Sequence, residues 1–519
     1  MSNPPLQSTN SRLWRSTFIV SAMTLLSRIA GLVRDMVFMN LFGAGKLMDA
    51  FLVAFKIPNF LRRLFAEGAF SQAFVPVLTD VRAQRGDAAV RQLIDHVAGS
   101  LTVIIGSLTA VAIVFSPAII FIFAPGFRED TVRFDLAADM LRITFPYLLL
   151  ISLTAFAGGI LNTYGRFGAS SFTPVLMNLT MIGCAVWLAP LLTTPIMALA
   201  WGVLIAGIVQ LGFQWFPLRQ INLVPRFKPD FKDPDVKRIL TLMLPAMFGV
   251  SVSQINLLLD TILASFLVAG SVSWLYTAER LTELPLGLIG IAVATVILPT
   301  LSTKHSERSD AEFRSTIDWA LKVIFMVGVP ASLAMGILAE PLMAALFHHG
   351  QFDRVDVVKS AMALQALSGG ILAFMLVKVF APAFYARQDV KTPVRIGIIA
   401  MVANMVFNLM LVWHLEHVGL SLASTLSAFL NAGLLYKGLH EKGIYRFERH
   451  WIKLALRFAL ANAVMVGVLL AITPDSLWWL DNPGWSRVGW VLLICVGGAA
   501  SYGLALLAVG FRPHELRHH

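Results

Sequence analysis

Residues 18–42 read FIVSAMTLLSRIAGLVRDMVFMNLF, and this stretch decides the fold. An apolar run of this length can cross a bilayer as one helix, for which about 20 residues are needed. Arg28, Arg34 and Asp35 interrupt the run. Ionised side chains at bilayer depth are costly, and they usually mark a polar cavity or pathway inside the membrane. The stretch therefore predicts a membrane protein whose first helix lines a polar cavity.

Two later apolar stretches carry charges in the same way. They hold Lys56, Arg62, Arg63 and Glu67 in one case, and Glu279, Arg280 and Glu283 in the other. Three charged helices are more than chance interruptions, so we expect them to line the same kind of polar space.

The composition is that of a polytopic membrane protein. Hydrophobic residues make up 57% of the 519 residues, charged residues make up 14%, and the mean hydropathy is +0.74. A soluble domain carries about 25% charged residues. The net charge of +11 lies mainly in short loops, where it sets topology, so no binding of nucleic acid is expected. We predict an all-α protein.

Fourteen transmembrane helices are expected when the sequence is divided at about 20 apolar residues per crossing. Each of the six loops after spans 2, 4, 6, 8, 10 and 12 is basic, for example Arg82, Arg85 and Arg91 after the second, and Lys437, Lys442, Arg446 and Arg449 after the twelfth. The loops on the other side are short, mixed or acidic, as in residues 475–485 with three tryptophans. Basic loops stay in the cytoplasm, so both termini are predicted to be cytoplasmic.

Short sequence matches indicate an internal repeat. Tyr164-Gly-Arg166 followed by Thr173-Pro174 is echoed by Tyr385-Ala-Arg387 followed by Thr392-Pro393. A shift of six spans preserves orientation, so the repeat predicts two parallel six-helix lobes, residues 1–220 and 221–445, with two added helices in residues 446–519. The substrate cavity is then expected between the lobes, opened alternately to each side of the membrane.

The intramembrane charges do not balance. Arg28 and Asp35 share a helical face two turns apart, whereas Arg34 is predicted to point about 120° away. Arg63 and Glu67 are spaced as a structural ion pair. Arg28, Arg34, Arg62 and Arg280 then remain in excess, and guanidinium groups grip phosphate oxygens in a bidentate fork. We therefore expect an anionic ligand such as a diphosphate.

A membrane enzyme acting on a polyprenyl phosphate is the alternative from another class of function. It would need a metal-binding carboxylate cluster or an activated nucleophile, whereas most acids here lie beside bases. The sequence has no GK[ST] phosphate loop, no HExxH and no GxSxG. We therefore expect a transporter and no enzyme, and an exporter of drugs or O-antigen is the rival within that class.

Several motifs closely resemble one known family. They are Ser27-Arg28-Ile-Ala-Gly31-Leu-Val-Arg34-Asp35, Asp49-Ala-Phe51, Asn59-Phe-Leu-Arg62-Arg63-Leu-Phe65-Ala-Glu67-Gly68, Phe145-Pro-Tyr147, Ala278-Glu-Arg280-Leu and Tyr385-Ala-Arg387-Gln-Asp389. The resemblance is to the MurJ (MviN) family of bacterial lipid II flippases, and it extends over essentially the whole chain.

The resemblance implies a fold of the multidrug/oligosaccharidyl-lipid/polysaccharide exporter superfamily in the bacterial inner membrane. The substrate would be lipid II, the undecaprenyl-diphosphate-linked precursor of peptidoglycan, moved to the periplasmic leaflet for cell-wall synthesis. The predicted substrate-binding residues are Arg28, Arg34, Arg62, Arg280, Asp35, Asp49, Lys56 and Glu67. Spans 13 and 14 would form a groove for the lipid tail. Membrane lipids are further partners, proteins of cell-wall synthesis or division are compatible ones, and a monomer is the default.

No cofactor is expected, but the resemblance raises a sodium site among spans 7, 11 and 12. Its candidate ligands here are Asp260, Asn404, Asn408 and Thr425. Their oxygens suit a hard cation, and they equally suit hydrogen bonds between membrane helices. The sequence leaves both interpretations open, and it leaves proton, sodium and membrane potential open as the driving force.

Overall fold

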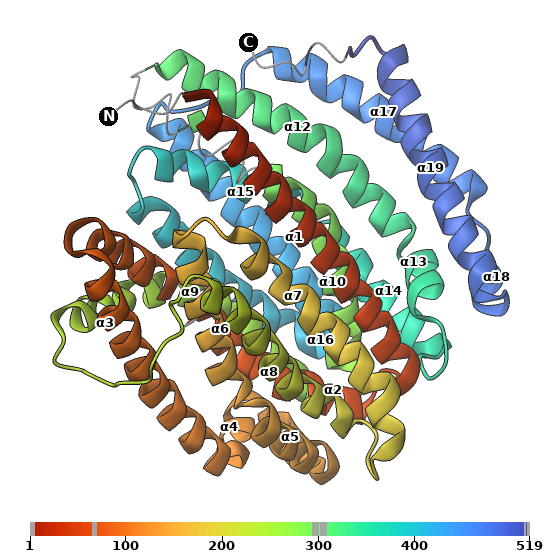
Figure 1. Cartoon of the computed structure of the whole chain (residues 1–519). Helices are drawn as coiled ribbons and strands as arrows, with labels where there is room; N and C mark the ends of the chain where they lie inside the picture. The colour runs from red at the N-terminus through yellow and green to blue at the C-terminus, as the bar shows by residue number, and fades with distance from the viewer. Residues whose placement is uncertain (1–5, 65–69, 293–299, 302–308, 513–514, 516–519) are drawn as a thin grey trace. The chain divides into compact units, whose positions relative to one another are not determined.

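The computed structural model describes residues 6–64, 70–292, 300–301, 309–512 and 515, and Figure 1 shows its helices. Every regular element among these residues is helical, and none of them is a strand. The expected all-α class is confirmed. By contact, the chain divides into two compact units, Met1–Ala269 and Gly270–His519.

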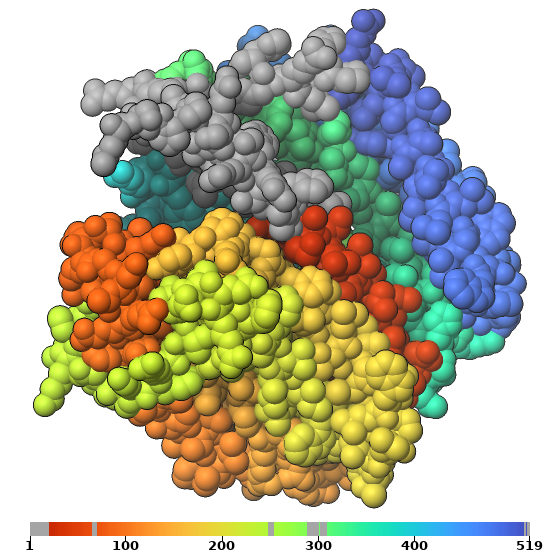
Figure 2. Space-filling view, viewed as in Figure 1, coloured from red at the N-terminus to blue at the C-terminus, as the bar shows by residue number. Residues whose placement is uncertain are grey.

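The first unit is a bundle in which α1 packs on α7, α2 on α5, and α3 on both α6 and α9. In Figure 2 the red surface of α1 borders the yellow surface of α7. The helices are α1 (Leu6–Phe42), α2 (Lys46–Arg62), α3 (Phe70–Val114), α4 (Ser116–Phe123), η2 (Pro125–Glu129), α5 (Thr131–Thr144), α6 (Tyr147–Thr163), α7 (Phe167–Gly183), η3 (Cys184–Leu188), η4 (Ala189–Leu191), α8 (Met197–Gln220) and α9 (Pro234–Ser265).

The second unit pairs α10 with α14, α15 with α16, and α17 with α19, while α12 contacts α15 and α17. Its helices are α10 (Ser271–Ala292), α12 (Asp310–Ile337), α13 (Ala339–Phe347), α14 (Arg354–Ser368), α15 (Ile371–Ala386), α16 (Lys391–Glu441), α17 (His450–Ile472), α18 (Ser476–Asp481) and α19 (Gly484–Ala508).

Local sequence explains where several helices begin and break. Asp233 caps α9, because its side chain accepts hydrogen bonds from the backbone amides of Asp235 and Val236. Pro234 suits the first helical position. The 45-residue α3 changes direction at Gly86, where φ is +74°. The 51-residue α16 breaks at Glu416, where φ is +51°. Each of these two long helices therefore contains two straight segments.

The helices suit a membrane. Within the described residues, eight are long and apolar enough to cross one, and the bent pair α14 and α15 makes a ninth. With α3 and α16 each counted as two segments, the helices are consistent with the fourteen expected spans. The three predicted segments, 1–220, 221–445 and 446–519, stay a prediction, because the two compact units divide the chain by contact and not by repeat. By contact, α9 belongs to the first unit.

Candidate anion-binding site

A buried ion pair lies in the last third of α1. The Nε and Nη2 atoms of Arg34 both donate to Oδ1 of Asp35, at 2.9 and 2.7 Å. Arg34 is 6% exposed and Asp35 is fully buried. The prediction that Arg34 points away from the face of Asp35 is wrong for the charged group, because its long side chain folds back and brings the guanidinium onto the neighbouring carboxylate.

An amide from α7 completes the surroundings of Arg34. Oδ1 of Asn178 accepts from Nη1 of Arg34 at 3.1 Å, and its Nδ2 donates to the backbone carbonyl of Ser27 at 3.1 Å. The ring of Phe38 lies 5.6 Å from the guanidinium carbon. All three guanidinium nitrogens of Arg34 thus donate to Asp35 or Asn178. These bonds fix the orientation of the guanidinium plane.

Arg28 lies on the same helix, roughly 9 Å before Arg34 at about 1.5 Å per residue. Its side chain is half-buried. Because α1 continues without a break from Leu6 to Phe42, Arg28 and Asp35 keep the two-turn spacing that the sequence predicts.

The second charged helix, α2, is tied to α9 by polar contacts. Nζ of Lys56 donates to Thr261 Oγ1 at 3.2 Å, and Nη1 of Arg63, just after α2, donates to Gln254 Oε1 at 3.1 Å. Glu67, the predicted partner of Arg63, lies outside the described residues, so their ion pair stays a prediction. The described partner of Arg63 is a neutral amide.

Arg62 and Asp49 lie at opposite ends of α2. Nε of Arg62 donates to Asn59 Oδ1 at 2.8 Å, one turn earlier on the same helix. Asp49 is fully buried in the first turn, where a negative charge is favoured by the helix dipole. Arg62 is half-buried.

The described charges on the inner part of α1 and on α2 to Leu64 give a clear excess of positive charge. Apart from Lys46, which pairs with Asp130 at 2.8 Å, they are five cations and two acids: Arg28, Arg34, Lys56, Arg62 and Arg63, and Asp35 and Asp49. Counting Glu67 among the acids still leaves an excess. Such a surplus in a membrane protein favours an anionic ligand.

In the second unit, Arg280 lies on α10 with a local acidic partner. Its Nη1 is 3.2 Å from Oε2 of Glu283, and the Arg280 side chain is 23% exposed. The local charged set that the sequence predicts is therefore present. Half-exposed ion pairs of this kind contribute little stability.

The candidate sodium ligands of the second unit form hydrogen bonds with their neighbours. Asn408 donates to Asn404 Oδ1 at 3.1 Å, Asn404 donates to Ser427 at 3.4 Å, and Thr425 donates to the carbonyl of Ala366 at 2.7 Å. Asp260 lies on α9 in the first unit. No cluster of three His, Cys, Asp or Glu that suits a metal occurs in the described part of the chain. A sodium ion stays a prediction.

Two groups of site residues escaped the sequence analysis. Asn178, Gln254 and Thr261 are single polar residues in apolar helices, which is the one signal that points to them. Lys378 is a lysine inside the apolar α15, and its Nζ donates to the carbonyl of Leu286 at 3.1 Å. An intramembrane lysine is a functional candidate by the same argument as the arginines.

Comparison with known proteins identifies a family. The model of the family described as "Lipid II flippase MurJ" matches residues 38–479. A probable lipid II flippase MurJ of Vibrio cholerae is 48% identical over 98% of both chains. A lipid II flippase MurJ of Burkholderia cenocepacia is 41% identical over 96% of this chain and 98% of its own.

Solved structures show the same fold. A structure titled as lipid II flippase MurJ in an inward closed conformation matches with a TM-score of 0.81 and 26% identity, covering 96% of this chain and 100% of its own. An inward-facing multidrug transporter of the MATE family matches with a TM-score of 0.68 at 16% identity, covering 82% of this chain and 98% of its own. The second likeness concerns the fold alone.

Proposed function

Because this chain belongs to the lipid II flippase MurJ family, we propose that it moves lipid II from the cytoplasmic to the periplasmic leaflet and holds the diphosphate with its intramembrane arginines. The proposed ligands of the diphosphate are Arg28, Arg34, Arg62 and Arg280, assisted by Lys56. Asp35, Asp49 and Glu67 are proposed to tune the charge of the site.

The observation that carries this proposal is the excess of cations over acids on α1 and α2. A diphosphate diester carries about two negative charges, and charge-assisted hydrogen bonds to guanidinium are about twice as strong as neutral ones. Asp35 pairs with Arg34, which limits the cost of a buried charge. The phosphate is proposed to bind Arg34 beside this pair.

Three proline-containing helices are proposed to supply the motion that transport requires. α2, α9 and α10 contain Pro58, Pro245 and Pro285 inside their lengths. A proline removes one backbone hydrogen bond and allows a kink. We propose that bending at these positions exposes the arginines first to the cytoplasm and then to the periplasm, with no chemical change in lipid II.

Membrane potential is the proposed driving force. One cycle carries about two negative charges outward, and each charge gains about 2.3 kcal/mol per 100 mV. An inside-negative potential of that size therefore favours export by roughly 4–5 kcal/mol. A sodium ion at Asp260, Asn404, Asn408 and Thr425 is the alternative, and it predicts a requirement for sodium at zero potential.

The test is translocation of a fluorescent lipid II in vesicles that contain the purified protein. Arg28→Ala, Arg34→Ala, Arg62→Ala and Arg280→Ala should each slow translocation while the protein stays inserted and folded. Arg449→Ala, an exposed arginine of a loop, is the matched control and should keep wild-type rates. Wild-type rates in all four variants would contradict the proposed site.

Two further arms separate the alternatives. Potential and sodium are varied independently, and a rate that follows sodium alone would replace the proposed driving force. The lipid recovered after transport should be intact lipid II, whereas a cleaved or transferred product would show an enzyme.

A further inference from the structure

The connection between α8 and α9, residues 221–233, lies against α3, and we call it the strap. Three of its backbone amides donate to α3: Arg226 to Asp95 Oδ1 at 2.7 Å, Lys228 to the Asp95 carbonyl at 3.3 Å, and Asp230 to Ser100 Oγ at 3.3 Å. A Cβ on Gly99 would lie 2.3 Å from the backbone nitrogen of Pro229. In Figure 2 the yellow-green surface of the strap borders the orange surface of α3. The strap is therefore fixed in position.

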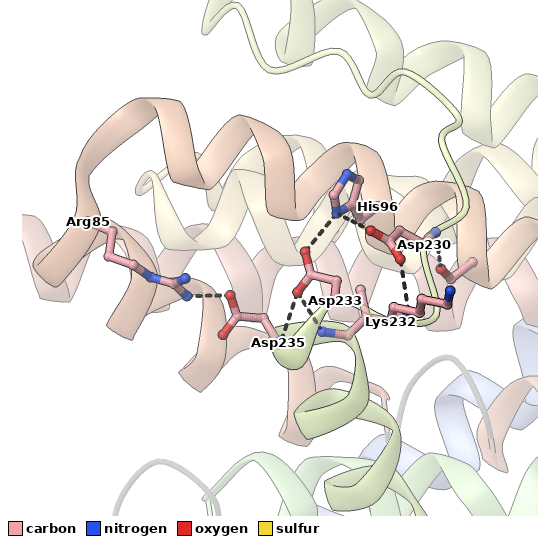
Figure 3. Close-up of polar contacts among 8 residues, drawn as sticks. Arg85, His96, Asp230, Lys232, Asp233 and Asp235 are labelled. Carbon is pink, nitrogen blue, oxygen red and sulfur yellow. Dashed lines mark hydrogen bonds and ion pairs between the residues drawn. The ribbon is translucent and has the colours of Figure 1, made fainter.

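The acids of the strap and of the start of α9 contact bases on α3, as Figure 3 shows. Nδ1 of His96 lies 2.7 Å from Asp233 and 3.8 Å from Asp230. Arg85 pairs with Asp235. The hydrogen bond from His96 also lowers the pKa of Asp233 against the opposing effect of burial. Asp233 and Asp235 thus already have basic partners on α3.

Four cations of the same region keep their charge available. They are Arg226, Lys228, Lys232 and Lys237, all exposed, and their side chains make no ion pair with any residue that the structure describes. The following Arg238 differs, because it pairs with Asp80 at 3.0 Å. The strap therefore presents a net positive surface on the side that the basic loops predict to be cytoplasmic.

An apolar cavity of about 320 Å³ lies directly beside the strap, between α3 and α9. Its wall includes Val97, Leu101, Ile105, Ile239, Met243 and Leu244. Ser100 lines the cavity and also accepts the amide of Asp230, so the polar end of the cavity is the strap itself. We call this space the α3–α9 cavity.

The mouth of the α3–α9 cavity is exposed, and Lys237 lies on the same face of α9 as two residues that line it. Leu240 and Leu244 line it and are 37% and 62% exposed. Lys237, Leu240 and Leu244 follow at i, i+3 and i+7, so they form one stripe along α9. A lysine therefore stands at one end of an apolar opening.

We propose that the strap and the α3–α9 cavity together bind an acidic phospholipid of the cytoplasmic leaflet. One acyl chain occupies the cavity, and the phosphate lies against Lys228 and Lys237. The lining of α9 from Val236 to Met247 spans roughly 16 Å, which is about half the thickness of a bilayer core. Compensated acids beside available lysines favour an anionic headgroup over a neutral one.

Such a lipid bridges α3 and α9 inside the first unit. It would use the faces of α3 and α9 that line the α3–α9 cavity, and the proposal holds whether or not the arginines of α1 and α2 bind lipid II. A free phosphate has no apolar group to fill the α3–α9 cavity. The cavity therefore favours a lipid, whose acyl chain can fill it.

The experiment uses the full chain in nanodiscs and phosphatidylglycerol with a photoactivatable group near the end of one acyl chain. Digestion and mass spectrometry then locate the adducts. We expect them on residues 97–105 of α3 and 236–247 of α9. Phosphatidylcholine with the same labelled chain should react at these segments far less at equal mole fraction. Equal labelling by both lipids, or labelling of these segments by lipid II alone, would overturn the proposal.

Two variants test the two halves of the site. Lys228→Gln with Lys237→Gln should weaken phosphatidylglycerol labelling about thirtyfold, since each lysine near an acidic headgroup contributes about a fivefold gain. Leu240→Trp, at the exposed mouth, should block entry of the acyl chain into the cavity. The fold should stay intact, and an unchanged melting temperature will show this. Arg446→Gln with Arg449→Gln, exposed cations of the second unit, is the matched control. Unchanged labelling in both test variants would refute the site.

Discussion

Asn178→Asp is the sharpest perturbation of the proposed site, because it changes charge with almost no change in shape. Oδ1 of Asn178 lies 3.1 Å from Nη1 of Arg34. The new carboxylate would stay ionised beside the guanidinium, and Arg34 would then face two acids instead of one. The second carboxylate would offset the attraction between Arg34 and a phosphate. Asn178 therefore acts here as a positioning residue that orients Arg34 without adding negative charge.

The size of the effect follows from the geometry. If a phosphate bound to Arg34 lies roughly 7 Å from the new carboxylate, their repulsion at an effective dielectric of about 20 is about 2.4 kcal/mol. That energy corresponds to roughly a fiftyfold weaker binding of the diphosphate. The apparent KM for lipid II in the vesicle assay should rise by about this factor, and the melting temperature should fall, because a carboxylate cannot donate to the Ser27 carbonyl as Nδ2 of Asn178 does.

Asn178→Leu is the matched control for this prediction. It removes the same two hydrogen bonds without adding charge, so it should cost only a few-fold in KM, together with about 1–3 kcal/mol of stability. The electrostatic argument is refuted if Asn178→Asp transports with the wild-type KM, or if Asn178→Leu raises KM as much as Asn178→Asp does.

Three other outcomes are expected. Arg34→Lys should fail to restore transport, because an ammonium cannot reproduce the three donors that Arg34 uses; full transport would show that charge alone suffices. Lys442 and Thr392 lower the pKa of Asp389 to about 2, so this acid stabilises the fold above about pH 4 and loses that effect as pH falls toward 2. The melting temperature of Asp389→Asn should therefore converge with wild type in acid, and a constant gap would contradict the pairing. Lys437→Cys and Asp481→Cys should label from opposite sides of the membrane, and labelling from one side would overturn the topology.

The sequence was sufficient for the fold class and for the location of the charged helices. Length, apolar runs and basic loops are properties of single segments, so they can be assessed without contacts. The breaks at Gly86 and Glu416 fall between apolar runs, and the basic loop with Arg82, Arg85 and Arg91 marks the first of them in the sequence. Helix ends there depend on a single backbone conformation.

The contacts of the site were predicted less well. Helical geometry alone separates Arg34 from Asp35. In a low-dielectric interior, however, the long and flexible arginine side chain turns toward the nearest carboxylate. Gln254 as a partner of Arg63 depends on how α9 packs, which no local pattern encodes. Asn178 was missed for the same reason, since one amide in an apolar helix has many equivalent explanations.

The membership of α9 in the first compact unit bears on how the chain can be made and divided. A ribosome that has released residues 1–220 has not yet produced the partners of Asp80, Arg85 and His96, which are all supplied by residues 230–238. The predicted first lobe, residues 1–220, is thus left with exposed charges until α9 is inserted. A gene split at residue 220 would strand those groups on one polypeptide, whereas a split after Ala269 would keep every one of these pairs on the same fragment.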